Sequence, residues 1–229
     1  MSPESPLGPE SPATPGESPD AGGAVRAGRV LVVCTGNVCR SPYIERRLAQ
    51  MLGDTGLVAS SAGTRAMVGA PIEPGSVELL EQAGADAAGF ASRQLTPAIL
   101  AEADLVVAAT QRHRSDAVAL NPRVLRRTFT LGELADLLAD TDLSTAAAEA
   151  LADASDTSDA SAGSPGPTPW VTRVAEAARD RRGFVRARPA EESDIPDPYG
   201  RGAEAYALMG AAIEDVLPVV AAALRPPTR

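Results

Sequence analysis

Short runs of apolar residues alternate along the chain with segments that have helical periodicity. Residues 29–33 (RVLVV) are the first such run, and Cys34 follows them directly. A run that is apolar at every position is typical of a strand buried on both faces of a parallel sheet. The same reasoning predicts strands at 57–61, 104–109 and 124–129.

The segments between these runs are predicted to be helices. The first helix is expected to begin at Ser41 and Pro42, because proline suits the first turn of a helix, and to end at Gly53. Strands that alternate with helices indicate an α/β fold with a parallel sheet. The other predicted helices cover residues 76–82, a segment that starts after Pro97, and residues 112–120, 170–182 and 203–223.

Two stretches lack the large apolar side chains that a core needs. Residues 1–28 are mainly Pro, Ser, Gly and Glu, which predicts a disordered N-terminal tail. Residues 141–168 are an acidic low-complexity segment to which the sequence assigns no fold. We therefore expect a single domain over residues 29–229 with an insertion at about 132–192, in which Trp170 is a core anchor.

The composition narrows the class of protein. The 229 residues carry a net charge of −9, which argues against a long surface for nucleic acid. No apolar run approaches the ~18 residues of a membrane span, so a membrane protein is not expected. The two cysteines are too few for a disulfide scaffold, and the N-terminal segment lacks the features of a secretory signal. A cytoplasmic protein is therefore expected.

A nine-residue motif, CTGNVCRSP, occupies residues 34–42 between the first predicted strand and the helix that follows it. In that position the backbone N–H groups of the loop and the N-terminus of the helix converge on one point and can bind an anion. The same field favours the thiolate form of Cys34, which is the candidate nucleophile. Arg40 is the candidate phosphate clamp, because a guanidinium can hold two phosphate oxygens at once.

The remaining residues of this motif are candidates for phosphate binding. Gly36 lets the backbone turn inward, the amide of Asn37 can hold the shape of the loop, and the Ser41 hydroxyl can donate to the thiolate. The full set of loop residues expected to bind substrate or phosphate is Thr35, Gly36, Asn37, Val38, Cys39 and Ser41.

A thiolate that attacks phosphorus needs an acid to protonate the departing oxygen. The late segment Asp197-Pro198-Tyr199 offers one on a loop that proline makes rigid. We expect Asp197 to donate that proton and then, as a carboxylate, to activate the water that hydrolyses the phosphocysteine. Asp194 is the alternative acid, and Tyr199 is expected to contact the substrate.

Together, the motif at 34–42 and Asp197-Pro198-Tyr199 resemble those of the low-molecular-weight protein tyrosine phosphatases. The segments SAGT (61–64) and SRQL (92–95) resemble further signatures in the family order. The resemblance implies a four-stranded parallel sheet flanked by helices, with no metal and no cofactor. It also implies hydrolysis of phosphotyrosine or similar aryl phosphates through phospho-Cys34, with Arg40 as clamp and Asp197 as acid.

The implied substrate is a phosphotyrosine protein or a small aryl phosphate, and a partner tyrosine kinase is conceivable. Two alternatives stay open: an arsenate reductase coupled to a small thiol, and a non-catalytic phosphate-binding module. Cys39 is either a packed side chain or the partner of Cys34 in a reversible disulfide. The one histidine, His113, is expected to be a surface or capping residue. The oligomeric state is left open.

Overall fold

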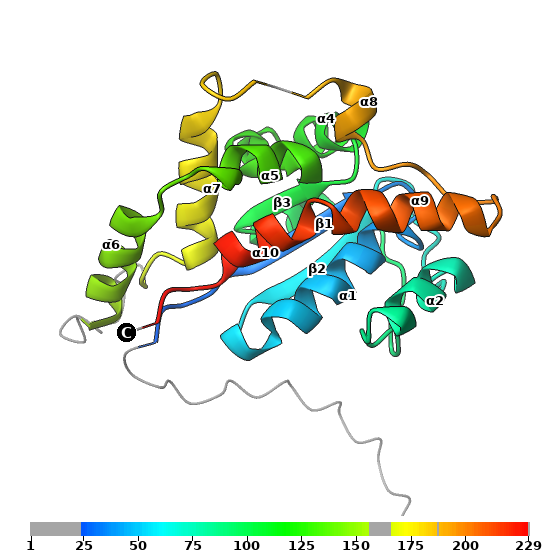
Figure 1. Ribbon diagram of the computed structural model, residues 1–229, viewed down its shortest axis with the longest axis horizontal. Helices are drawn as coiled ribbons and strands as arrows, with labels where there is room; N and C mark the ends of the chain where they lie inside the picture. Colours follow the sequence, from blue (N-terminus) through cyan, green and yellow to red (C-terminus); the bar gives the residue numbers. More distant parts are fainter. Residues whose placement is uncertain (1–23, 156–165, 187, 229) are drawn as a thin grey trace, which may run out of the picture.

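The computed structural model describes residues 24–155, 166–186 and 188–228. Its centre is one sheet of four parallel strands in the order β2-β1-β3-β4 (Figure 1). The predicted α/β class and the four-stranded parallel sheet are therefore confirmed. The strands are β1 (Arg29–Cys34), β2 (Val58–Gly63), β3 (Leu105–Ala108) and β4 (Thr128–Thr130).

Helices cover both faces of this sheet. Side chains alternate along β1, so that Val30 and Val32 belong to one apolar cluster and Leu31 and Val33 to the other. This double burial is why the strand is apolar at every position. The helices are α1 (Arg40–Leu52), α2 (Pro74–Gln82), α3 (Pro97–Glu102), α4 (Gln111–Leu120), α5 (Leu131–Ala139), α6 (Ser144–Ser155), α7 (Trp170–Arg181), α8 (Ala190–Ser193), α9 (Ala203–Glu214) and α10 (Leu217–Leu224). Two 3₁₀ turns, η1 (Gly53–Thr55) and η2 (Pro122–Arg127), complete the list.

The fourth strand is shorter than the sequence pattern predicts. Most of 124–129 belongs to η2, and the strand begins only at Thr128. Pro122 is at the start of this turn, and the Asn121 side chain accepts a hydrogen bond from the backbone N–H of Arg123. Such local capping favours a helical turn, whereas the apolar pattern alone suggests an extended chain.

The end of the expected N-terminal tail belongs to the folded body. Residues 1–23 lie outside the described residues. The carbonyl of Arg26, however, accepts a hydrogen bond from the backbone N–H of Trp170, and the side chain of Ala27 is buried. The expectation of disorder is therefore wrong for residues 24–28.

The expected insertion contributes to the core. All of helix α5 except its first residue, Leu131, falls within the predicted bounds of the insertion, and Leu134 and Leu138 on that helix are buried. Helix α6 covers part of the stretch to which the sequence assigned no fold, and its Ala150 is buried. Residues 156–165 of that stretch lie outside the described residues. Alanine-rich sequence has high helix propensity, which explains why α6 forms despite its low complexity.

The predicted C-terminal helix consists of two helices. Pro218 has no backbone N–H to bond the carbonyl of Glu214, so the chain breaks between α9 and α10. By length and composition alone, Ala203–Leu224 could cross a membrane, contrary to the expectation that no segment would. One face of this segment packs into the core, with Met209, Ile213, Leu217, Val220 and Leu224 buried, while Leu208 and Val219 are exposed.

Helix α7 is attached to the body through Trp170, which confirms its predicted role as an anchor. The indole is buried, and its Nε1 donates to the carbonyl of Ala223 over 2.9 Å. We expect Trp170→Ala to lower the free energy of unfolding by about 3–5 kcal/mol, because it leaves a large cavity. Trp170→Phe keeps most of the packing and should cost roughly 1–3 kcal/mol. Urea unfolding measures both.

The matched control is Phe184→Ala, because this ring is 85% exposed. It should change the free energy of unfolding by less than about 0.5 kcal/mol. If Trp170→Ala unfolded at the same urea concentration as Phe184→Ala, the segment that contains α7 would not be part of the cooperative core.

Candidate active site

The loop from Cys34 to Arg40 connects the end of β1 to the start of α1. Three consecutive carbonyls, those of Cys34, Thr35 and Gly36, accept hydrogen bonds from the backbone N–H groups of residues 64, 65 and 67. In a trans peptide the next N–H points opposite to the carbonyl. The N–H groups of residues 35–37 therefore point away from the 64–67 segment.

Asn37 holds this loop in shape. Its φ is +56°, a left-handed conformation that asparagine tolerates better than most residues. Its buried Nδ2 donates to the hydroxyls of Ser41 (2.9 Å) and Ser61 (2.7 Å), and its Oδ1 accepts from the backbone N–H of Arg93 (2.9 Å). The side chain thus ties the loop to α1, to β2 and to the SRQL segment at 92–95.

Ser92 and Gly63 support the same loop from behind. The Ser92 hydroxyl donates to the carbonyl of Gly36 over 3.0 Å. A Cβ atom at Gly63 would lie 2.4 Å from the carbonyl oxygen of Thr35, so a larger residue would displace the loop. These contacts give a structural reason for both short segments that the resemblance singled out.

The sulfur of Cys34 is next to a hydroxyl group. Its Sγ lies 3.0 Å from the Oγ of Ser41, and both side chains are buried. Either atom of this pair could be the donor, but a Cys34 thiolate can only accept, so the Ser41 hydroxyl would then donate to the sulfur. A negative charge on Cys34 would therefore be stabilised by a hydrogen bond.

Arg40 and Asp197 meet although they are far apart in sequence. The Nη2 of Arg40 lies 2.7 Å from the Oδ2 of Asp197, and its Nη1 donates to the carbonyl of Ile195 over 3.4 Å. The Arg40 side chain is 5% exposed, whereas that of Asp197 is 49% exposed. Among the residues that the structure describes, the buried Nε of Arg40 has no hydrogen-bond partner. The guanidinium can therefore accept a further anionic ligand.

A cavity of about 300 Å³ opens in front of the loop. Most of the predicted site residues line it, but Asn37 and Ser41 do not. These two are buried behind the loop, so they support it and do not form its surface. The lining residues are Cys34, Thr35, Gly36, Val38, Cys39, Arg40, Arg65, Met67, Asp197 and Tyr199.

Arg65 and Met67 are lining residues that the sequence analysis missed. Both lie within four residues of the end of β2, and the carboxyl ends of parallel strands meet at one edge of a sheet. That rule could have placed the 64–67 segment beside the end of β1.

The alternative acid, Asp194, is outside this cavity. Its Oδ1 accepts a hydrogen bond of 2.7 Å from the backbone N–H of Gln111, the first residue of α4. The carboxylate is therefore held at the start of a helix, and the expectation that it could replace Asp197 as acid is not supported by its position.

Cys39 is a packed thiol. Its Sγ lies 3.8 Å from the hydroxyl of Tyr206. Burial raises the pKa of Cys39 to about 12, which keeps it protonated at neutral pH. The two cysteines are both free, and among the described residues no cluster of three His, Cys, Asp or Glu side chains could hold a metal ion.

His113 is buried behind the loop, so the prediction of a surface position is wrong, whereas its contact with Thr110, the N-cap of α4, agrees with the capping alternative. Its Nε2 lies 2.8 Å from the hydroxyl of Thr35, and its Nδ1 lies 2.8 Å from that of Thr110. Burial, with the nearby charge of Arg40, lowers the pKa of His113 from 6.5 to about 4. The imidazole is therefore neutral at physiological pH. The position of His113 in the first turn of α4, just after the carboxyl end of β3, could have indicated that it lies near the loop.

Comparison with known proteins decides the family. A model of the low molecular weight phosphotyrosine protein phosphatases matches residues 29–144, about half of the chain. The protein belongs to this family. A relative, the probable low molecular weight protein-tyrosine-phosphatase EpsP of Ralstonia solanacearum, is 36% identical over 105 residues, which are 46% of this chain and 71% of EpsP. The family that the resemblance implied is thus confirmed. Members of this family are hydrolases.

Solved structures share the phosphatase fold. Wzb of Vibrio vulnificus, in complex with benzylphosphonate, superimposes with a TM-score of 0.56 at 22% identity, over 85% of this chain and 97% of Wzb. The YwlE arginine phosphatase of Geobacillus stearothermophilus gives a TM-score of 0.56 at 24% identity, over 85% of this chain and 91% of YwlE. The family match ends at residue 144, so it does not reach Asp197.

Protonation of His113 should destabilise this phosphatase in acid. Between pH 6.5 and about 4 the unfolded chain binds a proton at His113 that the folded chain does not, so stability falls as the pH is lowered through this window. We expect a loss of about 2 kcal/mol in the free energy of unfolding between pH 7 and pH 5. Urea unfolding at both pH values measures it.

The matched variant is His113→Gln, which cannot titrate in this range. It should be less stable than the wild type at pH 7 but should lose about 2 kcal/mol less between pH 7 and pH 5. The same pH slope in both proteins would contradict a neutral, buried His113.

Proposed function

We propose that this phosphatase hydrolyses phosphotyrosine, or similar aryl phosphate monoesters, through a phosphocysteine on Cys34. The observation that supports the proposal most strongly is that Cys34, Arg40 and Asp197 line one cavity at the carboxyl edge of the sheet. This arrangement offers a nucleophile, a cation for the phosphate group and an acid for the leaving oxygen. The loop from Cys34 to Arg40 is then the phosphate-binding loop.

In the first step the thiolate of Cys34 attacks phosphorus and the bond from phosphorus to the aryl oxygen breaks. Asp197 donates its proton to that oxygen, so that a neutral phenol leaves. Arg40 binds two of the phosphate oxygens, and its contact with the substrate replaces the present contact with Asp197. The backbone N–H groups of the loop bind the remaining charge.

In the second step water hydrolyses the phosphocysteine. The Asp197 carboxylate takes a proton from this water, oxygen bonds to phosphorus, and the bond from sulfur to phosphorus breaks. The Ser41 hydroxyl, 3.0 Å from the sulfur, stabilises the thiolate that leaves. Inorganic phosphate is the product.

The walls of the cavity favour an aromatic ester. Val38, Met67 and the ring of Tyr199 contribute apolar surface around the loop. Relatives such as EpsP are named protein-tyrosine-phosphatases, and the benzylphosphonate that Wzb binds has an aromatic ring one carbon from phosphorus. YwlE has a similar fold and is named an arginine phosphatase, so phosphoarginine is the substrate class to compare.

The cellular setting remains a prediction. We propose a cytoplasmic enzyme that acts on phosphotyrosine proteins, with a tyrosine kinase as the source of its substrate. A reversible disulfide between Cys34 and Cys39 also remains a proposal. Both residues line the same cavity, but the raised pKa of Cys39, about 12, would make this thiol slow to react with an oxidised Cys34.

Steady-state hydrolysis tests the proposal. Cys34→Ser should lower kcat for para-nitrophenyl phosphate and for a phosphotyrosine peptide at least about 10³-fold, because the hydroxyl is a poor nucleophile. Asp197→Ala should lower kcat for the peptide roughly 10²–10⁴-fold. Mass spectrometry of the quenched wild-type enzyme should find phosphate on Cys34.

The control variant is Phe184→Ala, whose side chain is exposed and away from the cavity lining. It should keep the wild-type kcat. No turnover by the reduced wild type would overturn the proposal and favour arsenate reduction or phosphate binding without catalysis. If a phosphoarginine peptide were hydrolysed faster than the phosphotyrosine peptide, phosphoarginine would replace phosphotyrosine as the proposed substrate class.

A further inference from the structure

Residues 193–199, here called the acid loop, carry Asp197 but contain no strand. Only Ser193 at its start is helical, as the last residue of α8. The Asp197 side chain is 49% exposed, and its partner among the described residues outside the loop is Arg40. In the proposed reaction this partner binds the phosphate group instead. Something other than Arg40 must then hold the acid loop in place.

A first anchor attaches the acid loop to the end of β3 and to the start of α4. The Oδ1 of Asp194 accepts from the backbone N–H of Gln111 at 2.7 Å, and the backbone N–H of Ile195 donates to the carbonyl of Ala109 at 2.8 Å. A carboxylate at a helix N-terminus is favoured by the unpaired N–H groups and by the helix dipole. The buried side chain of Ile195 adds apolar contact at the same place.

A second anchor joins the loop to the start of α5. The hydroxyls of Ser193 and Thr130 lie 2.8 Å apart, and both side chains are buried. Thr130 is also the N-cap of α5, in a capping box with Glu133. Gly132 leaves room for this contact, because a Cβ atom there would lie 3.3 Å from the carbonyl oxygen of Ser193.

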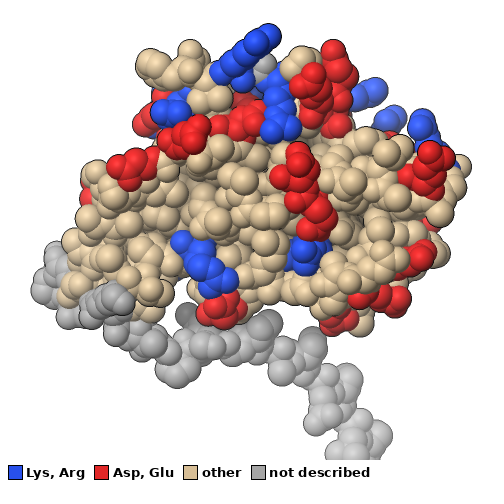
Figure 2. All heavy atoms as spheres, in the orientation of Figure 1, with Lys and Arg blue, Asp and Glu red and all other residues tan. Residues whose placement is uncertain are grey.

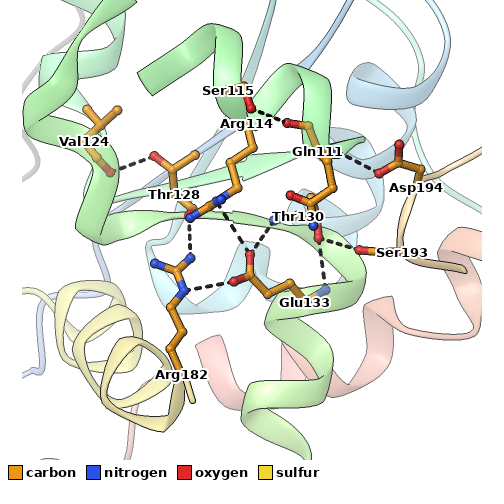
Figure 3. A network of polar contacts seen from close by, with 10 residues as sticks. All are labelled: Gln111, Arg114, Ser115, Val124, Thr128, Thr130, Glu133, Arg182, Ser193 and Asp194. Carbon is orange, nitrogen blue, oxygen red and sulfur yellow. Dashed lines mark hydrogen bonds and ion pairs between the residues drawn. The ribbon is translucent and has the colours of Figure 1, made fainter. Parts of the chain in front are cut away.

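Arg182, the residue that follows α7, stabilises the second anchor (Figure 3). Its Nε donates to Glu133 at 2.9 Å and its Nη2 donates to the carbonyl of Thr128 at 2.7 Å. The guanidinium carbon also lies 4.0 Å from the centre of the Phe129 ring. At the top of Figure 2, where α8 and the end of α7 lie, side chains of both charges accordingly stand close together.

We propose that Asp194 and Arg182 are positioning residues for the general acid. Asp194 fixes the acid loop to α4, and Arg182 fixes the chain of contacts from Glu133 through Thr130 to Ser193. The inference rests on the proposed role of Asp197. Only Ile195 and Pro196 separate Asp194 from Asp197, and proline restricts the backbone between them. A shift at Asp194 is therefore passed on to the acid.

Proton transfer is sensitive to such a shift. The acid must approach the leaving oxygen to about 2.6–3.2 Å, and a displacement of about 1 Å can cost roughly 10²-fold in rate. A good leaving group departs without a proton, so its rate does not depend on the acid. Loss of positioning should therefore slow the hydrolysis of aryl phosphates with basic leaving groups more than that of esters with good leaving groups. A general loss of stability would slow both.

The experiment measures kcat/KM for phenyl phosphate and for 2,4-dinitrophenyl phosphate, because kcat/KM reports the first chemical step. For Asp194→Ala we expect a loss of about 10–100-fold with phenyl phosphate and less than about 3-fold with dinitrophenyl phosphate. Arg182→Ala should show the same selectivity with a loss of about 3–10-fold. Asp194→Asn retains an oxygen that can accept from Gln111 and should restore most of the rate.

Each variant has a matched control. Thr96→Ala removes an N-cap from α3, where the Thr96 side chain accepts from the backbone N–H of Ile99. Arg179→Ala removes a partly exposed cation from α7 that pairs with its neighbour Asp180. Neither should change the ratio of the two kcat/KM values. Circular dichroism and urea unfolding confirm that each variant is folded at the assay temperature.

Asp197→Ala in the same series separates the two proposals. If Asp197→Ala is selective for phenyl phosphate but folded Asp194→Ala and Arg182→Ala are not, the positioning roles are overturned and the proposed function stands. If Asp197→Ala has the same effect on both esters, its role as acid fails and the positioning proposal fails with it.

Discussion

The geometry of the site depends on one buried amide, that of Asn37. The residue has a left-handed backbone, and its side chain uses both amide atoms to bind Ser41, Ser61 and the backbone of Arg93. Glycine would adopt this backbone easily but would supply none of the three bonds. The conformational cost is thus offset by contacts that join three segments, and the loop that lines the cavity takes its shape from them.

The charge within this loop comes from few groups. Arg40 is almost completely buried; its Nη2 is paired with Asp197, but its buried Nε has no partner among the described residues, which costs free energy. His113 lies behind the loop, where burial and Arg40 lower its pKa to about 4, so it adds no positive charge at neutral pH. The positive field at the cavity therefore comes from Arg40, from Arg65 in the cavity lining and from the N-terminus of α1, and Asp197 opposes it. A bound phosphate group would lower the free-energy cost of burying Arg40. The affinity for phosphate therefore depends on how deeply the fold buries this side chain.

The sequence predicted those features of the molecule that depend on residues close together along the chain. The run at 29–33 predicts a buried strand because both of its faces pack into apolar clusters, and the motif at 34–42 predicts the loop because its residues are consecutive. The burial of His113 and the contribution of Met67 depend on which strand ends are adjacent in space. The polar character of one helix contains no such information, so His113 was assigned to the surface or to a helix cap.

The acid illustrates how the fold accommodates a long intervening segment. Asp197 follows β4 by more than sixty residues. Among the described residues, the partners of its loop in the first and second anchors all precede that segment in sequence: Ala109, Gln111 and Thr130. These residues are at the ends of β3 and β4 or at the start of α4, which the sheet fixes relative to Cys34. The segment that contains α6 and α7 can therefore differ in length without moving the acid, provided that its last residues return to the same three anchors. Arg182 binds Glu133, which forms the capping box with Thr130, so a change within that segment can still reach the site through this residue.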